Sequence, residues 1–360
     1  MRKIVRFLLR RPILWLANRF SSDPDKERIF EALSDLKERL ENDPGKKGFL
    51  IPFDINTSRY ILFSDQHKGR KNGADDFAQA ENNYVSALKY YNAHGFHYIS
   101  LGDSEELWEN TLLQVKKHNA VSFNAERQFA LRNAFTKIFG NHDLDWEINP
   151  LAAVDLKELY GSQVAVLEGI ILQTTINKKT LTIFCTHGHQ GDLQSDGNLF
   201  SKFFVSKIWA PLQAYLRINP NTPAYDASLK TEHNLFMYEW SSRQQDLLLI
   251  TGHTHQPVFE SLTHLERLQR QDAIKQSRNE PFERTYNLPT PSLETFQKIR
   301  PSYFNTGCCC YDDGDITGIE IEEGCIRLVK WEEKSGESIR TLLEEISLVE
   351  VAARLTGGSR

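Results

Sequence analysis

The stretch IFGNHDLDW, residues 138–146, sets an asparagine, a histidine and an aspartate side by side, directly after an apolar run and a glycine. Glycine and asparagine suit a tight turn at the end of a strand. A turn alone has no need of His142 or Asp143. The stretch therefore indicates a turn that also carries chemistry, and Gly140 is interpreted as the residue that lets the backbone turn.

Four other apolar stretches end in a similar polar tip. Their tips are Asp65-x-His67, Gly102-Asp103-x-x-Glu106, His187-Gly188-His189 and Gly252-His253-x-His255. Together with GNHD they hold six of the eleven histidines. Imidazole and carboxylate groups suit Mn²⁺, Fe or Zn²⁺, and residues two apart in an extended segment point to the same side. One such motif arises often by chance, whereas five in order, each after an apolar strand, predict a metal site.

The order of apolar runs, polar tips and helical patterns predicts an α/β fold, in which ligands bind at the carboxyl ends of strands. After about residue 160 the pattern changes, and two β-hairpins are expected around 177–179 and 323–324. The helices expected from apolar residues at helical spacing cover about 25–41, 77–91, 105–134 and 336–354, with further helical patches in 192–245.

On these five motifs, over about residues 60–260, the chain resembles the calcineurin-like metallophosphoesterase superfamily, whose signature runs D-x-H, G-D-x-x-D/E, G-N-H-D/E, H and G-H-x-H. The resemblance implies an α/β/β/α sandwich of two mixed sheets with metals at the strand ends. The expected domains are a basic N-terminal segment plus amphipathic helix (1–50), the phosphoesterase domain (51–335, with a helical cap insertion at 192–245), and a C-terminal helix and tail (336–360).

The resemblance also implies two divalent metal ions, with Mn²⁺ favoured over Fe or Zn²⁺, and no ligand position is substituted. His142 would face the substrate. Asp143 is interpreted either as the partner that orients the His142 ring or as a residue that stabilises the turn. Carried over residue by residue, the ligands of one metal are Asp65, His67 and His255, those of the other are Asn141, His187 and His253, and Asp103 bridges the two.

The implied activity is hydrolysis of a phosphoester or pyrophosphate bond. A hydroxide bridging the metals would attack in line, and His142 would assist as a general acid. An alternative within the superfamily is a lipid-linked pyrophosphatase like the UDP-2,3-diacylglucosamine diphosphatase branch, which also has a helical insertion here. Against it, this chain has extra ends, and His142 stands where that branch usually has arginine. An alternative of another class is a catalytically silent interaction scaffold.

Three residues are candidate substrate contacts, each with a plainer alternative. Arg70 lies in the basic segment 68–73, which would hold a phosphate or form a solvated loop. His189 follows the predicted ligand His187 by two residues and would otherwise be a loop residue. Lys202 lies among the aromatic residues of the cap, which suits a nucleotide- or lipid-linked substrate but also ordinary helix packing.

Composition bounds the location and partners. A net charge of −5 gives no basic field for nucleic acid, and no nucleic-acid partner is expected. Residues 1–20 hold six basic side chains and no acid. They would lie on an anionic membrane surface, pack on the domain as a helix, or form a mitochondrial-type presequence. Five cysteines, with Cys308–Cys310 consecutive, fit reduced thiols in a cytoplasmic protein and are interpreted as small apolar strand residues.

Overall fold

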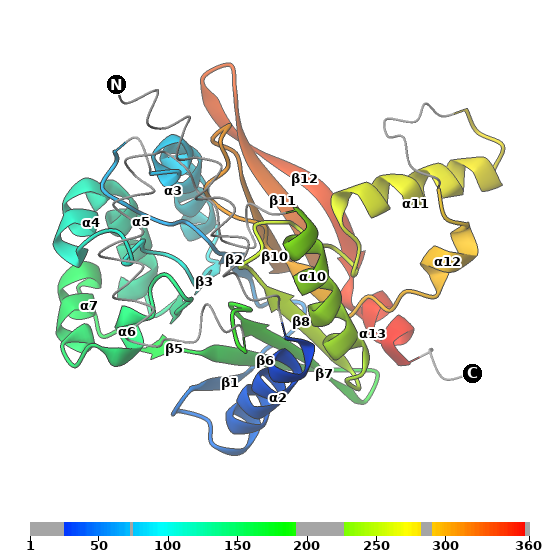
Figure 1. The fold of residues 1–360 in the computed structure, drawn as a ribbon, viewed down its shortest axis with the longest axis horizontal. Coiled ribbons are helices and arrows are strands. Elements are labelled where there is room, and N and C mark those ends of the chain that lie inside the picture. The colour runs from blue at the N-terminus through cyan, green and yellow to red at the C-terminus, as the bar shows by residue number, and fades with distance from the viewer. Residues whose placement is uncertain (1–24, 73–74, 192–226, 282–289, 357–360) are drawn as a thin grey trace, which may run out of the picture.

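Two β-sheets face each other, and helices cover the outer face of each sheet (Figure 1). The computed structural model describes residues 25–72, 75–191, 227–281 and 290–356. The strand orders are β1-β6-β7-β8-β9 in the five-stranded sheet and β12-β11-β10-β2-β3-β4-β5 in the seven-stranded sheet. Both sheets mix parallel and antiparallel pairs. The expected sandwich of two mixed sheets is confirmed.

The strands are β1 (Gly48–Pro52), β2 (Tyr60–Phe63), β3 (His97–Leu101), β4 (Phe135–Ile138), β5 (Val166–Leu167), β6 (Gly169–Ile176), β7 (Lys179–Thr186), β8 (Leu247–Thr251), β9 (Tyr303–Asn305), β10 (Ile316–Glu322), β11 (Cys325–Lys334) and β12 (Glu337–Ser347). The helices are α2 (Lys26–Asn42), α3 (Phe77–Ala93), α4 (Leu112–His118), α5 (Ala120–Leu131), α6 (Asp145–Ile148), α7 (Ala152–Tyr160), α10 (Ala227–Ser242), α11 (His264–Ser277), α12 (Leu293–Gln297) and α13 (Leu348–Thr356).

Alternation along β2 shows why the sheets pack as layers. Leu62 is fully buried in the core between the two sheets, with Ile99 of β3 and Ile250 of β8. Its neighbours Ile61 and Phe63 are buried in a second core, between the seven-stranded sheet and helices α3 and α5. Successive side chains of a strand point to opposite faces, so a strand covered on both sides is apolar throughout. This explains the continuous apolar runs before each polar tip.

Helices α2 and α10 cover the outer face of the five-stranded sheet. The predicted spacing of α2 is confirmed, since Ile29, Leu33, Leu36 and Leu40 are all buried against that sheet. The carboxylate of Asp25 caps the helix by accepting the backbone N–H groups of residues 27 and 28. α2 therefore packs as an outer layer of the sandwich.

The expected C-terminal helix over 336–354 is wrong in its first two thirds. Residues 337–347 form β12, which pairs antiparallel with β11, and only α13 is helical. Ser335 and Gly336 both have positive φ, 56° and 85°, as a two-residue type I′ hairpin turn requires. Leu348 and Val351 of α13 lie in the core between the sheets. The C-terminal segment therefore completes the sandwich instead of forming an appendage.

The other expected elements hold with two qualifications. Both predicted hairpins are present, with turns at 177–178 and 323–324. The helix expected over 105–134 is two helices, because α4 ends at His118 and α5 begins anew at Ala120, with Asn119 as the cap between them. Of the cap expected at 192–245, residues 227–242 form α10, whereas 192–226 lie outside the described residues, as does the basic segment 1–20.

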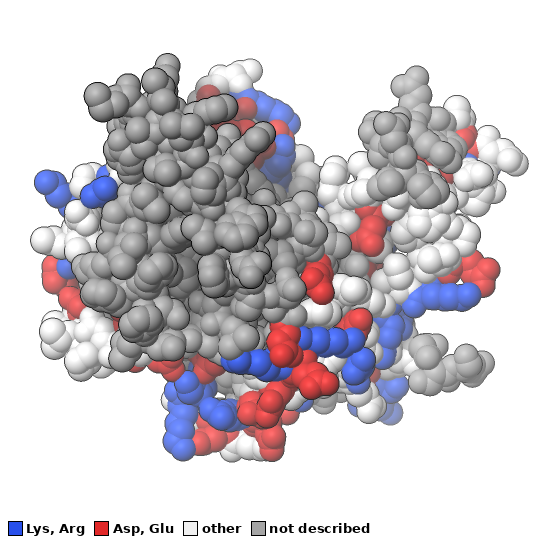
Figure 2. Space-filling model, viewed as in Figure 1, with Lys and Arg blue, Asp and Glu red and all other residues white. Residues whose placement is uncertain are grey.

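Charges of both signs are interspersed over the described part of the face in Figure 2, most densely around α2. Lys37 and Glu41 of α2, for example, form an ion pair of 2.8 Å. Along the described stretches of the chain, no helix combines the length and the apolar character that a membrane crossing requires.

Candidate metal centre

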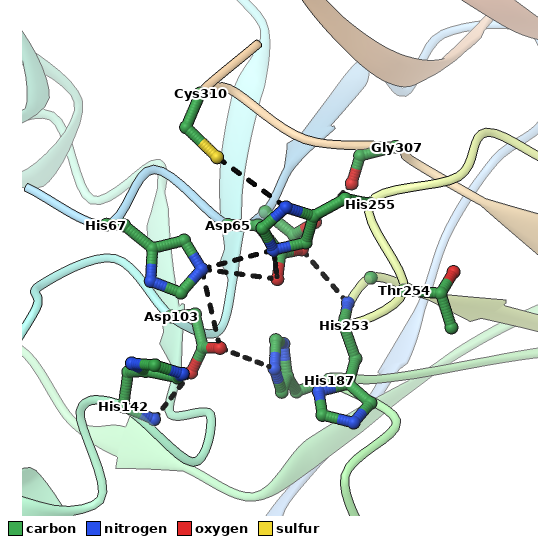
Figure 3. Close-up of polar contacts among 12 residues, drawn as sticks. Asp65, His67, Asp103, His142, His187, His253, Thr254, His255, Gly307 and Cys310 are labelled. Atoms are coloured by element: carbon green, nitrogen blue, oxygen red, sulfur yellow. Dashed lines mark hydrogen bonds and ion pairs between the residues drawn. The ribbon is translucent and has the colours of Figure 1, made fainter. Parts of the chain in front are cut away.

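Side chains of the five polar tips come together in one place (Figure 3). Strands β2, β3 and β4 are parallel neighbours and end just before the 65–67, 102–106 and 140–143 tips. In the other sheet, β7 and β8 are parallel neighbours that end before the two histidine tips. Parallel neighbours end at the same edge, so the two sheets present their tips to each other.

Five of the predicted ligands have backbone conformations that L-residues with side chains rarely adopt. Such left-handed conformations are uncommon outside glycine and persist where the surrounding structure enforces them, often at functional sites. The φ angles are 53° at Asp65, 50° at His67, 50° at Asp103, 69° at His253 and 55° at His255.

Two glycines of the motifs make room for ligand side chains. A Cβ on Gly140 would overlap the carboxylate and backbone nitrogen of Asp103, and one on Gly252 would overlap the carboxylate of Asp65. Neither glycine has a left-handed φ. Gly140 therefore also serves the close approach of Asp103, at the start of the turn that the sequence predicts.

Asp65, His67 and His255 face one another. The Nε2 atom of His255 lies 3.2 Å from Oδ1 of Asp65 and 3.2 Å from Nε2 of His67. The distance from His67 Nε2 to Asp65 Oδ1 is 3.8 Å. Two imidazole nitrogens and a carboxylate oxygen at these separations form a donor set for one cation.

Asp103, His187 and His253 form a second group, whose ligand atoms lie within 4.8 Å of one another. The Nε2 atom of His187 is 3.1 Å from Oδ2 of Asp103. The Oδ1 atom of Asn141 is buried and has no hydrogen-bond partner among the described residues. A buried amide oxygen left unpaired costs about 1–3 kcal/mol. Its placement fits an oxygen ligand of a metal ion.

Asp103 lies between the two groups. Its Oδ2 atom is 3.7 Å from Nε2 of His67 and 3.1 Å from Nε2 of His187. Its other oxygen accepts the backbone N–H of His142 at 2.8 Å. The carboxylate thus occupies the position that a bridging ligand needs. The donor atoms of the two groups fit the metals that the resemblance implies.

The electrostatics of the metal-free site favour protonated imidazoles at three positions. Burial lowers the pKa of His67, but the hydrogen bond to Glu106 and the nearby carboxylates outweigh it and raise that pKa to about 10. Against the same burial effect, Asp103 and Asp65 raise the pKa of His187 to about 9, and chiefly Asp65 raises that of His255 to about 9. An excess of negative charge is therefore built into the site.

The His142 ring is fixed by two neighbours, Glu106 and Trp108. Its Nδ1 atom is 2.6 Å from Oε2 of Glu106, and the same oxygen lies 3.1 Å from Nδ1 of His67. Trp108 stacks on the His142 ring, with centroids 4.2 Å apart and an interplanar angle of 18°. Burial raises the pKa of Glu106, but His142 and His67 lower it to about 2. The ionised carboxylate accepts at both Nδ1 atoms and leaves each Nε2 for other chemistry.

Asp143 does not orient His142. Its carboxylate accepts the backbone N–H groups of Gly140 at 2.6 Å and Ser104 at 2.9 Å, and it lies 3.9 Å from Nζ of Lys137. Glu106, three residues after Asp103 on the neighbouring tip, occupies the orienting position instead. The interpretation of Asp143 as a catalytic partner is therefore wrong, and its role as a turn-stabilising residue holds.

Of the three predicted substrate contacts, Arg70 and His189 lie within the described residues. Arg70 is exposed, but its basic neighbours are engaged: Lys68 is fully buried between Glu105 and Glu126, and Lys71 pairs with Glu81. The segment therefore offers a phosphate one free-standing arginine at most. Lys202 lies outside the described residues.

His189 is buried close to the second group of ligands. Its ring centroid is 5.4 Å from that of His187 and 6.0 Å from that of Phe139. Burial, followed by the charge of His187, lowers its pKa to about 3, so the ring is neutral. A neutral, buried imidazole at this place is a polar wall of the site, and the contact of His189 with a substrate stays a prediction.

Sequence reasoning missed three residues that touch the site. Glu106 belongs to the second motif, but the sequence does not show that its side chain contacts two histidines, because that contact depends on the fold. Trp108 follows it by two residues, and nothing in the sequence pairs an indole with His142. Cys310, interpreted as an apolar filler, lies with its Sγ 3.7 Å from Nδ1 of His255. The cysteine run stood out in the sequence, but its distance along the chain from His255 concealed the contact.

No family model and no curated protein matches the sequence. Among solved structures, the chain is similar to vacuolar protein sorting 29 from Cryptosporidium parvum, with 13% identity, 81% of this chain and 98% of that one covered, and a TM-score of 0.31. A Vps29 from Entamoeba histolytica complexed with Zn²⁺ gives 12% identity, 79% and 98% coverage, and a TM-score of 0.28. A hypothetical protein from Thermus thermophilus gives 11% identity, 80% and 100% coverage, and a TM-score of 0.25. Likeness at this level carries no weight for function.

Proposed function

We propose that this chain is a metal-dependent phosphoesterase. The observation that carries the proposal is the meeting of five sequence-distant tips around Asp103, whose carboxylate touches a histidine of each ligand group. The buried, unpaired amide oxygen of Asn141 supports it, because that atom needs a partner. The motif order resembles that of the calcineurin-like superfamily, and the two-sheet sandwich agrees with that resemblance.

The ligand set divides into two positions that share one carboxylate. Asp65, His67 and His255 would hold one cation, Asn141, His187 and His253 would hold another, and Asp103 would contact both. When bound, such ions supply Lewis-acid activation of a phosphoryl group and of water. The mixed nitrogen and oxygen donors suit Mn²⁺, Fe or Zn²⁺.

The chain's own residues supply proton transfer beside the ligands. Glu106 fixes the Nδ1 side of the His142 ring, and Trp108 covers one face of it. The Nε2 atom of His142 is then the nitrogen available to carry a proton to a leaving oxygen. A positioned general acid of this kind contributes about 10²–10⁴-fold to a rate. His142 thus acts on the ester, whereas Glu106 holds the His142 ring in place.

The test is a hydrolysis screen of the full chain, loaded with Mn²⁺, on an aryl phosphate, a bis-aryl phosphodiester and a nucleoside diphosphate sugar. At least one class should turn over, chelation should abolish the turnover, and Asp103→Asn should reduce both metal binding and rate. Asp312→Asn, on an exposed loop, is the matched control and should leave both unchanged. Absence of turnover on all three classes, with metal shown to be bound, would contradict the proposal.

A further inference from the structure

The three consecutive cysteines divide between two environments. Cys309 is buried in the outer core with Phe63 and Ile316, away from the metal centre. Cys310 places its Sγ 3.7 Å from Nδ1 of His255. Cys308, also buried, lies close enough to both His255 and Cys310 to interact with them electrostatically. Two thiols, here called the thiol pair, therefore meet one ligand histidine, while the residue between them points elsewhere.

The loop that carries the thiol pair is held from both sides of the centre. The Thr306 hydroxyl is 2.6 Å from that of Ser64, and the backbone N–H of Cys309 donates to the carbonyl of Asp65 at 3.2 Å. The Tyr311 hydroxyl donates to the carbonyl of His255 at 3.1 Å. The loop is thus bonded to two of the three predicted ligands of the first group, Asp65 and His255, so the position of its sulfurs relative to His255 is fixed.

The two nitrogens of His255 face different partners (Figure 3). Nδ1 faces the sulfur of Cys310, whereas Nε2 faces Oδ1 of Asp65 and Nε2 of His67, each at 3.2 Å. A histidine that binds a metal through one nitrogen usually donates its other N–H to an acceptor, which fixes the tautomer and the ring orientation. Sulfur is a weak acceptor that can fill that position.

We propose that the thiol pair positions His255 for metal binding. Its sulfurs accept the Nδ1–H of the ring, so that the lone pair of Nε2 is directed at the space shared with Asp65 and His67. The inference rests on the proposed function, because it assumes that this group holds a metal. It also distinguishes the two imidazoles of the group, since Nδ1 of His67 is held by a carboxylate and Nδ1 of His255 by sulfur.

The experiment is a Mn²⁺ titration of the metal-free full chain, followed by the paramagnetic resonance signal of the free ion. The wild-type chain should bind at two positions. The Cys308→Ala/Cys310→Ala variant should lose affinity about 10–100-fold at one position and keep the other, as expected when the outer partner of a ligand histidine is removed. Cys309→Ala, the matched control, should bind as the wild type does.

A second measurement separates positioning from a general loss of structure. In ¹⁵N spectra of histidine in the Zn²⁺-loaded chain, the His255 ring should be a single Nδ1–H species in the wild type and Cys309→Ala, and its Nδ1–H signal should change in the double variant. Should the double variant fail to fold, Cys310→Ala alone, which removes the 3.7 Å contact, should show the same direction of change.

Equal Mn²⁺ affinity at both positions in the wild type and the folded thiol variants would overturn the inference. So would an equal loss in Cys309→Ala, because that residue does not touch His255. A wild-type chain that binds no Mn²⁺ would instead contradict the proposed function itself, so the two failures are distinguishable.

Discussion

Glu106 contacts the Nδ1 atoms of two histidines with one oxygen, at 3.1 Å for His67 and 2.6 Å for His142. Removing its charge should therefore disturb a predicted metal ligand and the predicted general acid together. Glu106→Gln should lower kcat by about 10²–10⁴-fold even at saturating Mn²⁺, because the orientation of His142 is lost. Steady-state kinetics of this variant, compared with Glu158→Gln on the exposed side of α7, measure the effect. Equal kcat values for the two variants would show that Glu106 is not needed.

The raised pKa values of the candidate ligand histidines predict a pH dependence of metal binding. In the metal-free chain the pKa is about 10 for His67 and about 9 for His187 and His255, so the rings are protonated at neutral pH. A metal must displace these protons. Its apparent affinity should therefore rise as the pH increases toward 9 and fall at lower pH.

Calorimetry in buffers of different ionisation enthalpy gives the number of protons released when Mn²⁺ binds. Release of at least one proton per ion near neutral pH is expected. Binding without proton release, or with an affinity that falls as the pH rises, would contradict the assignment of these three rings as ligands.

At the scale of secondary structure, the sequence predicts most elements but not the C-terminal ones. The strands before each tip are apolar on both faces, and their short runs and polar ends identify them. Residues 337–347 mislead because β12 is an edge strand with partly exposed Ile339 and Leu342, so its apolar residues follow neither period clearly. The Ser-Gly turn at 335–336 is the local signal that favours a hairpin.

The candidate site is also only partly predictable from the sequence. The residues that gather at the site could be predicted because each motif is local and follows a strand. The contacts of Glu106, Trp108 and Cys310 could not, because they depend on how separate loops approach one another. The contacts of Asp143 are hidden in the sequence for the same reason, since one of its two backbone partners, Ser104, belongs to another tip.

The placement of α13 leads to a stability prediction. Leu348 is fully buried in the core between the sheets, whereas its neighbour Val349 is 44% exposed. Leu348→Ala should lower the free energy of unfolding by about 2–5 kcal/mol, because it leaves a cavity in a packed core. Val349→Ala should change it by less than about 0.5 kcal/mol. Denaturant unfolding of both variants provides the comparison, and equal stabilities would show that α13 does not complete the core.

For the whole chain, the basic segment 1–20 remains a prediction, because it lies outside the described residues. Near an anionic surface each basic side chain contributes about 1 kcal/mol at best, and salt screens the attraction. The full chain should sediment with anionic vesicles at low salt and be released at high salt. A chain that starts at Ser21 should stay in the supernatant while keeping its activity on small esters. Equal sedimentation of the two would assign the segment to packing or targeting.

The central claim is that the two sheets present one dinuclear metal centre to a phosphoester. The measurement that tests it most directly is anomalous diffraction from crystals of the Mn²⁺-loaded full chain. The account predicts two anomalous peaks. One should lie among Asp65, His67 and His255, the other among Asn141, His187 and His253, with the Asp103 carboxylate between them. A loaded crystal without a peak among these residues, or with metal only at other positions, would contradict the account.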